Sequence, residues 1–180
     1  MSENIIRGRV WVLLDKDGRP IEDIDTDQIF HNAHLHITEL AQMGPLALGN
    51  LEGWKDFPQK AKPGDIVVAG RNFGAGSSRQ QAVDCFIALK TAGILAPSFS
   101  AIYFRNAVNS GFPVVRIHGL EELVHGQALV SGDEIEMDVL GGQARNLTRG
   151  AAFTLEPMSA VQADIYRAGD LFKYGKTGGR

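Results

Sequence analysis

Side chains able to do chemistry are concentrated in a glycine-rich segment, GRNFGAGSSRQQ, at residues 70–81. Ser77 and Ser78 supply hydroxyl groups, and Arg79 supplies a guanidinium that can bind a carboxylate through two parallel hydrogen bonds. A helix expected directly after this segment would add backbone amides and a partial positive charge. This combination suits a carboxylate ligand. A serine hydroxyl placed there could act as a base that abstracts a proton next to a carboxylate.

Two other interpretations of the segment compete with this anion site. In the first, the segment is only a tight connection between a strand and a helix, and Gly74 and Gly76 supply backbone freedom. In the second, the segment binds a nucleotide phosphate, but a P-loop requires a lysine before its hydroxyl residue, and here the order is Ser-Ser-Arg. The fingerprint G-x-G-x-x-G also fails, because Arg79 stands where its third glycine would be. A nucleotide site is therefore disfavoured, whereas the tight connection remains open.

A second polar stretch, IDTDQIFHNAHLHIT, occupies residues 24–38 and contains His31, His34 and His36. A stretch so rich in polar residues predicts an exposed loop. Neutral imidazoles suit zinc or iron, but the spacing of these histidines has no helical or strand geometry that brings all of them to one point. We therefore expect a polar specificity loop and no metal site.

Cys85 is the single cysteine of the chain. One thiol cannot form an internal disulfide, and by itself it cannot supply the several thiolates that a zinc or iron-sulfur site usually needs. Any cluster must come from another chain. Because Ala82, Cys85, Phe86 and Leu89 recur at helical spacing, we expect Cys85 to be a small core residue on an apolar helix face.

The bulk composition is that of an ordinary globular domain. With 180 residues, 44% hydrophobic and 22% charged, the chain is expected to form one domain over residues 1–180. A net charge of −3 gives no basic surface to drive binding to nucleic acid. The chain has no run of about 18 apolar residues and no basic start followed by an apolar run. We therefore expect neither a nucleic-acid nor a membrane partner, and a cytoplasmic location.

The elements expected around the glycine-rich segment alternate between strand and helix. A short buried strand at residues 65–70 precedes the segment, and a helix from about residue 78 to residue 91, ended by Gly93, follows it. The pattern then predicts a strand at 94–97, a helix at 98–111 ended by Gly111, and a strand at 112–117. Such a β-α-β-α-β succession favours an α/β fold with a parallel core over residues 65–117.

Elements with weaker signals flank this core. They are an opening strand at 5–14, a possible short helix at 38–43, short strands around 134–140, 144–149 and 151–157, and a closing helix at 159–169.

Two long motifs resemble the swivelling domain of the aconitase superfamily, as found in the small subunits of 3-isopropylmalate dehydratase and homoaconitase. The motifs are GDIVVAGRNFGAGSSRQQA at 64–82 and SFSAIYFRNAVNSGFPVV at 98–115. IDTDQI at 24–29 matches an N-terminal signature of that family, and AGDLFKYGK at 168–176 is similar to its C-terminal helix and tail. The resemblance covers most of the chain and implies a swivelling β/β/α domain.

The resemblance also implies a division of labour between two chains. A large partner subunit would hold a [4Fe-4S] cluster, whose open iron binds the substrate hydroxyl and a carboxylate, and this chain, without a cofactor of its own, would close over it. Ser77 corresponds to the family's proton-abstracting base, and Ser78 and Arg79 to residues that bind and orient a substrate carboxylate. The small-molecule substrate would be a di- or tricarboxylate.

Other residues of the family motifs are expected to support the site. Asp25, Thr26 and Asp27 either hold the geometry of the loop or serve only as turn and cap residues. Arg105 and Asn106 are expected to tie the second helix to the glycine-rich segment.

The chain departs from the family where the substrate is expected to be recognised. His34 to Ile37 stand where most small subunits have tyrosine, leucine, arginine and threonine, so His36 replaces the arginine. Histidine is a shorter and weaker carboxylate partner than arginine, which favours a substrate with an apolar group at that end. Gln80 and Gln81 replace an acidic residue and a histidine of the family and remove one charge near the loop.

The activity expected from the resemblance is dehydration or isomerisation of a substituted malate. Because of the histidines at 34 and 36, 3-isopropylmalate is the first expected substrate, with homocitrate or dimethylmalate as alternatives. A binding module that kept the fold and lost the reaction is a different class of function. The intact Ser77, Ser78 and Arg79 argue against it, because a binding module needs no base beside a carboxylate site.

Overall fold

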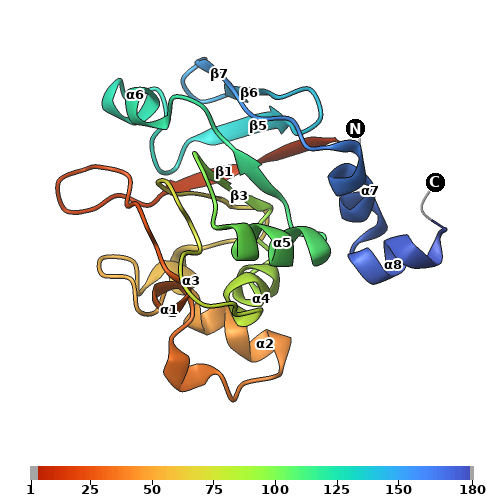
Figure 1. Ribbon diagram of the computed structural model, residues 1–180. Coiled ribbons are helices and arrows are strands. Elements are labelled where there is room, and N and C mark those ends of the chain that lie inside the picture. The colour runs from red at the N-terminus through yellow and green to blue at the C-terminus, as the bar shows by residue number, and fades with distance from the viewer. Residues whose placement is uncertain (1–3, 179–180) are drawn as a thin grey trace.

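The computed structural model describes residues 4–178, which form a seven-stranded sheet with the strand order β4-β3-β2-β1-β5-β6-β7 (Figure 1). The strands are β1 (Ile5–Val12), β2 (Ile66–Val68), β3 (Gly93–Ala96), β4 (Val114–Arg116), β5 (Glu134–Asp138), β6 (Gln143–Asn146) and β7 (Ala152–Thr154). The α-helices are α1 (Thr26–Ile29), α2 (Leu40–Met43), α3 (Phe57–Lys60), α4 (Gln81–Ala88), α5 (Ala101–Asn109), α6 (Leu120–His125), α7 (Ala160–Ala168) and α8 (Leu171–Lys176), and the 3-10 helices are η1 (Asn32–His34) and η2 (Gly44–Leu46).

The sheet has a parallel half and an antiparallel half that meet at β1. Strand β1 pairs in parallel with β2, which pairs in parallel with β3, and β3 with β4. On its other edge β1 pairs antiparallel with β5, and β5, β6 and β7 continue as an antiparallel meander. The predicted parallel core over residues 65–117 is therefore confirmed, and β1 extends it by one strand.

Each face of the parallel half packs against its own hydrophobic core. Val67 of β2 belongs to a core under α4 and α5, together with Phe86 and Tyr103. The neighbouring Val68 points to the opposite face and joins a second core under α6 and the antiparallel strands. Figure 1 shows α4 and α5 on one side of the sheet and α6 on the other. The continuous apolar run of β2 follows from burial on both faces.

The helix after the glycine-rich segment is shorter than predicted. It begins at Gln81 and ends at Ala88, so Ser77, Ser78 and Arg79 lie in the loop before it. Gly93 does not end this helix but is the first residue of β3; the chain turns away from the helix at Lys90, whose φ is +57°. The sequence pattern placed the start too early because polar groups of residues 77 and 79 bond to residues 26, 27 and 30.

The prediction of an exposed loop over residues 24–38 was wrong for its first half. Residues 26–29 form α1, and Ile24, Ile29 and Phe30 are fully covered by the first core. The burial of these apolar side chains stabilises the helical conformation, and the polar residues between them concealed it in the sequence. The remaining part, from Asn32 onward, is mostly exposed as expected.

The parallel topology brings three chain segments to one edge of the sheet. The chain leaving the carboxyl end of β1 reaches α1, the chain leaving β2 forms the glycine-rich loop, and the chain leaving β3 enters α5. Backbone bridges join Asp25 to Ala75 and Phe73 to Phe99, so the loop lies between the other two segments. Sites in parallel α/β sheets form at this edge. No helix within residues 4–178 has the length and apolar character needed to span a bilayer.

Candidate active site

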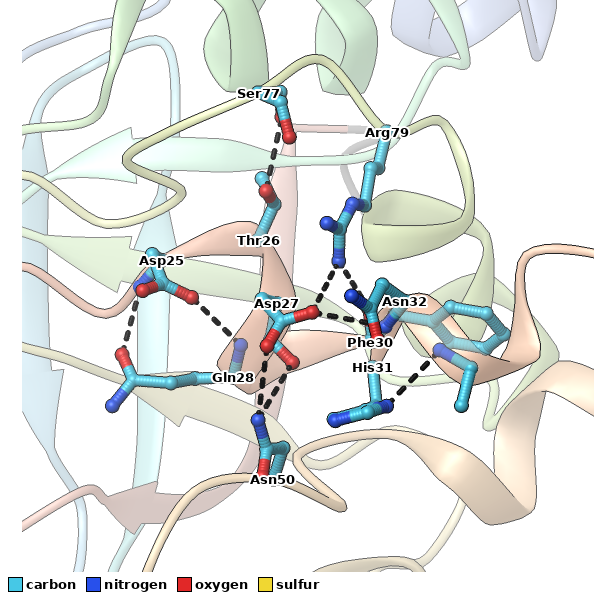
Figure 2. Close-up of polar contacts among 11 residues, drawn as sticks. Asp25, Thr26, Asp27, Gln28, Phe30, His31, Asn32, Asn50, Ser77 and Arg79 are labelled. Carbon is cyan, nitrogen blue, oxygen red and sulfur yellow. Dashed lines mark hydrogen bonds and ion pairs between the residues drawn. The ribbon is translucent and has the colours of Figure 1, made fainter.

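The start of α1 holds the glycine-rich loop through its backbone. The Thr26 amide donates to the Ala75 carbonyl (2.9 Å), and the Thr26 hydroxyl donates to the Ser77 carbonyl (3.0 Å), as Figure 2 shows for the second contact. Gly74 has a φ of +81°, and a Cβ there would overlap the Tyr103 ring, so only glycine fits. The loop conformation that exposes Ser77 is thus fixed by the hydrogen bonds from Thr26 and by the close approach of Gly74 to α5.

Arg79 is anchored at one nitrogen and free at the others. Its Nη1 donates to Asp27 Oδ1 and to the Phe30 carbonyl, both at 2.9 Å (Figure 2). The side chain is only 14% exposed. Within residues 4–178, Nη2 and Nε have no hydrogen-bond partner. The guanidinium is therefore held in one orientation and keeps two adjacent donors for a carboxylate.

Asp27 is the centre of the contacts that hold Arg79. Its Oδ1 also accepts a hydrogen bond from the Asn32 amide (2.9 Å), and its Oδ2 accepts one from Asn50 Nδ2 (3.1 Å). The hydrogen bond from Arg79 and then that from Asn32 lower the pKa of Asp27 below its ordinary value. The carboxylate therefore stays charged at neutral pH and positions Arg79; it is not a proton donor.

Replacing Asp27 by asparagine is expected to lower the free energy of unfolding at neutral pH by less than about 1 kcal/mol, because the carboxylate is 36% exposed and water screens the ion pair. Since its pKa is lower in the folded chain, the charged form stabilises the fold above the ordinary value of 3.8. That stabilisation is lost as the pH falls through the folded pKa. Denaturant unfolding of both proteins from about pH 6 to about pH 2.5 should therefore show the difference shrinking with acid.

The control for this experiment is Asp17→Asn, because the Asp17 carboxylate accepts no hydrogen bond from any residue between 4 and 178. If the difference in free energy of unfolding between wild type and Asp27→Asn stayed the same at acid pH, the lost stabilisation would not come from the charge of Asp27.

Asp25 caps α1 and does not face the loop hydroxyls. Its side chain accepts from the Gln28 amide (2.8 Å), and the Gln28 side chain accepts from the Asp25 amide (3.0 Å), which is a reciprocal capping box (Figure 2). Of the two interpretations given above for residues 25–27, the cap therefore describes Asp25, while Thr26 and Asp27 contact the loop directly.

The two serines differ in their surroundings although both are exposed. Ser78 Oγ accepts a hydrogen bond from Asn106 Nδ2 (3.2 Å). Ser77 Oγ has no partner within the described chain, and neither do the backbone N–H groups of residues 76–80. Consecutive free N–H groups before a helix attract anions. Ser77 thus lies beside donors that can stabilise an alkoxide or bind a carboxylate.

Of the histidines at residues 31–36, only His31 and His34 are in ring contact. His31 Nδ1 accepts from the Ala33 amide (3.0 Å), and the His34 ring lies edge-on to His31 and Phe30 at centroid distances of 6.1 and 6.2 Å. His36 is exposed and has no side-chain partner in the described structure. Across residues 4–178 there is no group of three or more His, Cys, Asp or Glu residues able to hold a metal ion.

The structure agrees with the expected role of Cys85 and adds one residue that the sequence did not indicate. Cys85 is fully buried, and burial raises the pKa of its thiol, so it is an unreactive core residue.

Asn50 holds Asp27, yet it lies in a region without any recognisable motif, and no signal in the sequence pointed to it. A cavity of about 990 Å³ lies elsewhere, between residues 15–22 and α6, and none of the expected site residues lines it.

The chain that carries these residues is similar to several known proteins. The family model of the aconitase C-terminal domain matches residues 24–118. The chain is 44% identical to the 3-isopropylmalate dehydratase small subunit of Pyrobaculum aerophilum, over 95% of this chain and 97% of that protein. It is 39% identical to the methanogen homoaconitase small subunit of Methanothermobacter thermautotrophicus, over 96% and 91%. The crystal structure of 3-isopropylmalate dehydratase from Methanocaldococcus jannaschii superposes with a TM-score of 0.83, 29% identity and coverage of 97% and 95%.

Proposed function

Because the chain belongs to the aconitase C-terminal domain family, we propose that it is the small subunit of an aconitase-type hydro-lyase that interconverts 2-isopropylmalate and 3-isopropylmalate. This activity is a step of leucine, hence branched-chain amino acid, biosynthesis. We infer a cytoplasmic location, because the cysteine of the chain is free and buried, as is usual for proteins of reducing compartments.

One observation supports the reaction above all others: the Ser77 hydroxyl is exposed and free among unpaired backbone N–H groups, two residues before Arg79 with its open donors. A hydroxyl is a weak base unless its alkoxide is stabilised, and fixed N–H donors with a nearby cation supply that stabilisation. Arg79 and Ser78 bind a substrate carboxylate and place the adjacent C–H bond against Ser77. The alkoxide of Ser77 then takes this proton, and hydroxide leaves from the neighbouring carbon.

The departing hydroxide needs a Lewis acid that this chain does not supply. The cysteine of this chain, Cys85, is buried and its thiol is protonated. The residues of the chain therefore do not fit an iron-sulfur cluster. We place the [4Fe-4S] cluster in a large partner subunit, where it would bind the substrate hydroxyl and ease its departure. The loop of residues 76–80 lies on an open surface. Such a surface suits a site that is completed by a second chain.

The substrate is proposed from the loop at residues 34–37. The relatives include both a 3-isopropylmalate dehydratase and a homoaconitase small subunit at similar identity, so overall similarity does not choose between an alkyl malate and a tricarboxylate. The departure at residue 36 supports an alkyl malate: His36, which stands where most small subunits have arginine, is exposed and directly follows Leu35, which is itself 40% exposed. An imidazole beside an apolar side chain favours the isopropyl group over a further carboxylate.

Reconstitution with a cluster-bearing large subunit tests the proposal. The purified pair is expected to turn over 2-isopropylmalate and 3-isopropylmalate, with a higher kcat/KM than for homoaconitate or dimethylmalate, and neither subunit alone is expected to be active. Turnover of homoaconitate only would assign the chain to a homoaconitase. A pair that binds malates without any turnover would support the non-catalytic binding module.

A further inference from the structure

The loop of residues 77–80 is held from two sides, one formed by α1 and the other by α5. Asn106 Nδ2 donates to Ser78 Oγ (3.2 Å), and Gln80 Nε2 donates to Ser110 Oγ (2.8 Å). Asn106 and Ser110 are four residues apart and face the same way, and the Ser110 hydroxyl donates to the Asn106 carbonyl (2.9 Å). Residues 78 and 80 are thus held by α5 and by Ser110, which directly follows it.

The residues of α1 hold the other two residues of this loop. Thr26 holds the Ser77 carbonyl, and Asp27 holds the Arg79 guanidinium. Residues 77 and 79 therefore bond to α1 and the residue that follows it, whereas residues 78 and 80 bond to α5 and the residue that follows it. Between these contacts the Ser77 hydroxyl is left free, whereas the Ser78 hydroxyl accepts a hydrogen bond from Asn106.

We propose that Asn106 is a positioning residue that directs the Ser78 hydroxyl toward the substrate carboxylate, an inference that rests on the function proposed above. A serine hydroxyl has one proton to donate and two lone pairs. When the Asn106 amide donates to Ser78 Oγ, that oxygen acts as acceptor and its proton is directed to another acceptor. A carboxylate only accepts hydrogen bonds, so Ser78 is prepared to donate to it.

This role differs from ordinary packing between helix and loop. A packing residue would affect the stability of the loop, and with it kcat, KM and folding together. Asn106 instead acts through one hydroxyl that binds the ground state as well as the transition state, so its loss should mainly raise KM. The contact is at the surface and part of no hydrophobic core, so its removal should leave the fold unchanged.

The test is a double-mutant cycle in the assembled two-subunit enzyme with 3-isopropylmalate. Asn106→Ala is expected to raise KM by about three- to tenfold with little change in kcat, from the usual net value of one neutral hydrogen bond, here the one from Asn106 to Ser78. Ser78→Ala should raise KM at least as much, and the double variant should behave like Ser78→Ala alone, because Asn106 acts only through Ser78. Asn106→Asp should be worse than Asn106→Ala, because a carboxylate there accepts the Ser78 proton and repels the substrate.

Asn109→Ala is the matched control, because Asn109 lies on the same helix and its side chain has no hydrogen-bond partner within residues 4–178. It is expected to leave KM and kcat unchanged. Additive effects of Asn106→Ala and Ser78→Ala, or a fall in kcat at constant KM, would overturn the inference while the wild-type activity upholds the proposed function. Absence of turnover of any malate by the wild-type pair would contradict both.

Discussion

Replacing Ser77 by alanine is expected to lower kcat of the assembled enzyme by about 10²- to 10⁴-fold, the usual contribution of a positioned general base. Ser77 Oγ has no partner among the described residues and is exposed, so its removal breaks no contact of the fold. The Ser77 carbonyl, which accepts from Thr26, remains in the variant. The free energy of unfolding should therefore stay within about 0.5 kcal/mol of wild type.

Ser159→Ala is the control, because it should lower stability and leave turnover unchanged. Ser159 caps α7 and accepts a hydrogen bond from the Gln162 amide (3.2 Å). Its loss should cost about 1 kcal/mol of stability without an effect on turnover. Steady-state kinetics and denaturant unfolding of both variants separate the two roles. A loss of kcat below about tenfold in Ser77→Ala would mean that another group abstracts the proton.

The parallel half of the sheet could be predicted because its signals are local. β2 and β3 are short apolar runs buried on both faces, β4 begins with the buried pair Val114 and Val115, and α5 and α7 each begin at a serine that caps the helix. Gly111, with a φ of +65°, stands just beyond the end of α5 as predicted. These features depend on neighbours within a few residues, so the sequence pattern is sufficient to locate them.

The place of β1 and the contacts of the site depend on residues distant in the sequence. Nothing in residues 5–14 shows that β1 lies between β2 and β5, because strand partners are chosen by the packing of the whole sheet. Likewise Asp27 and Arg79 are 52 residues apart. Their contact needs both the parallel topology and the conversion of residues 26–29 into a helix, which the polar composition of that stretch concealed.

Replacing His36 by arginine is expected to shift the substrate preference of the assembled enzyme toward a tricarboxylate. Arginine binds a carboxylate through a permanently charged two-pronged contact, whereas histidine is shorter and is not a permanent cation. The ratio of kcat/KM for homoaconitate to that for 3-isopropylmalate should rise roughly ten- to hundredfold, the usual value of a charge-assisted hydrogen bond. A competition between the two substrates, with each small subunit paired to the same large subunit, measures this ratio.

The substitution is informative because the exposed His36 side chain has no hydrogen bond, ion pair or ring contact within residues 4–178 that its loss would break. The backbone beside it is anchored, since Gln81 Nε2 donates to the Leu35 carbonyl (3.4 Å), so an arginine at 36 would project from a fixed position near α4. His125→Arg adds the same charge on α6, across the sheet from α4, and should leave the ratio unchanged. An unchanged ratio in His36→Arg as well would show that the loop at residues 34–37 does not contact the variable end of the substrate. Specificity would then be set by the large subunit.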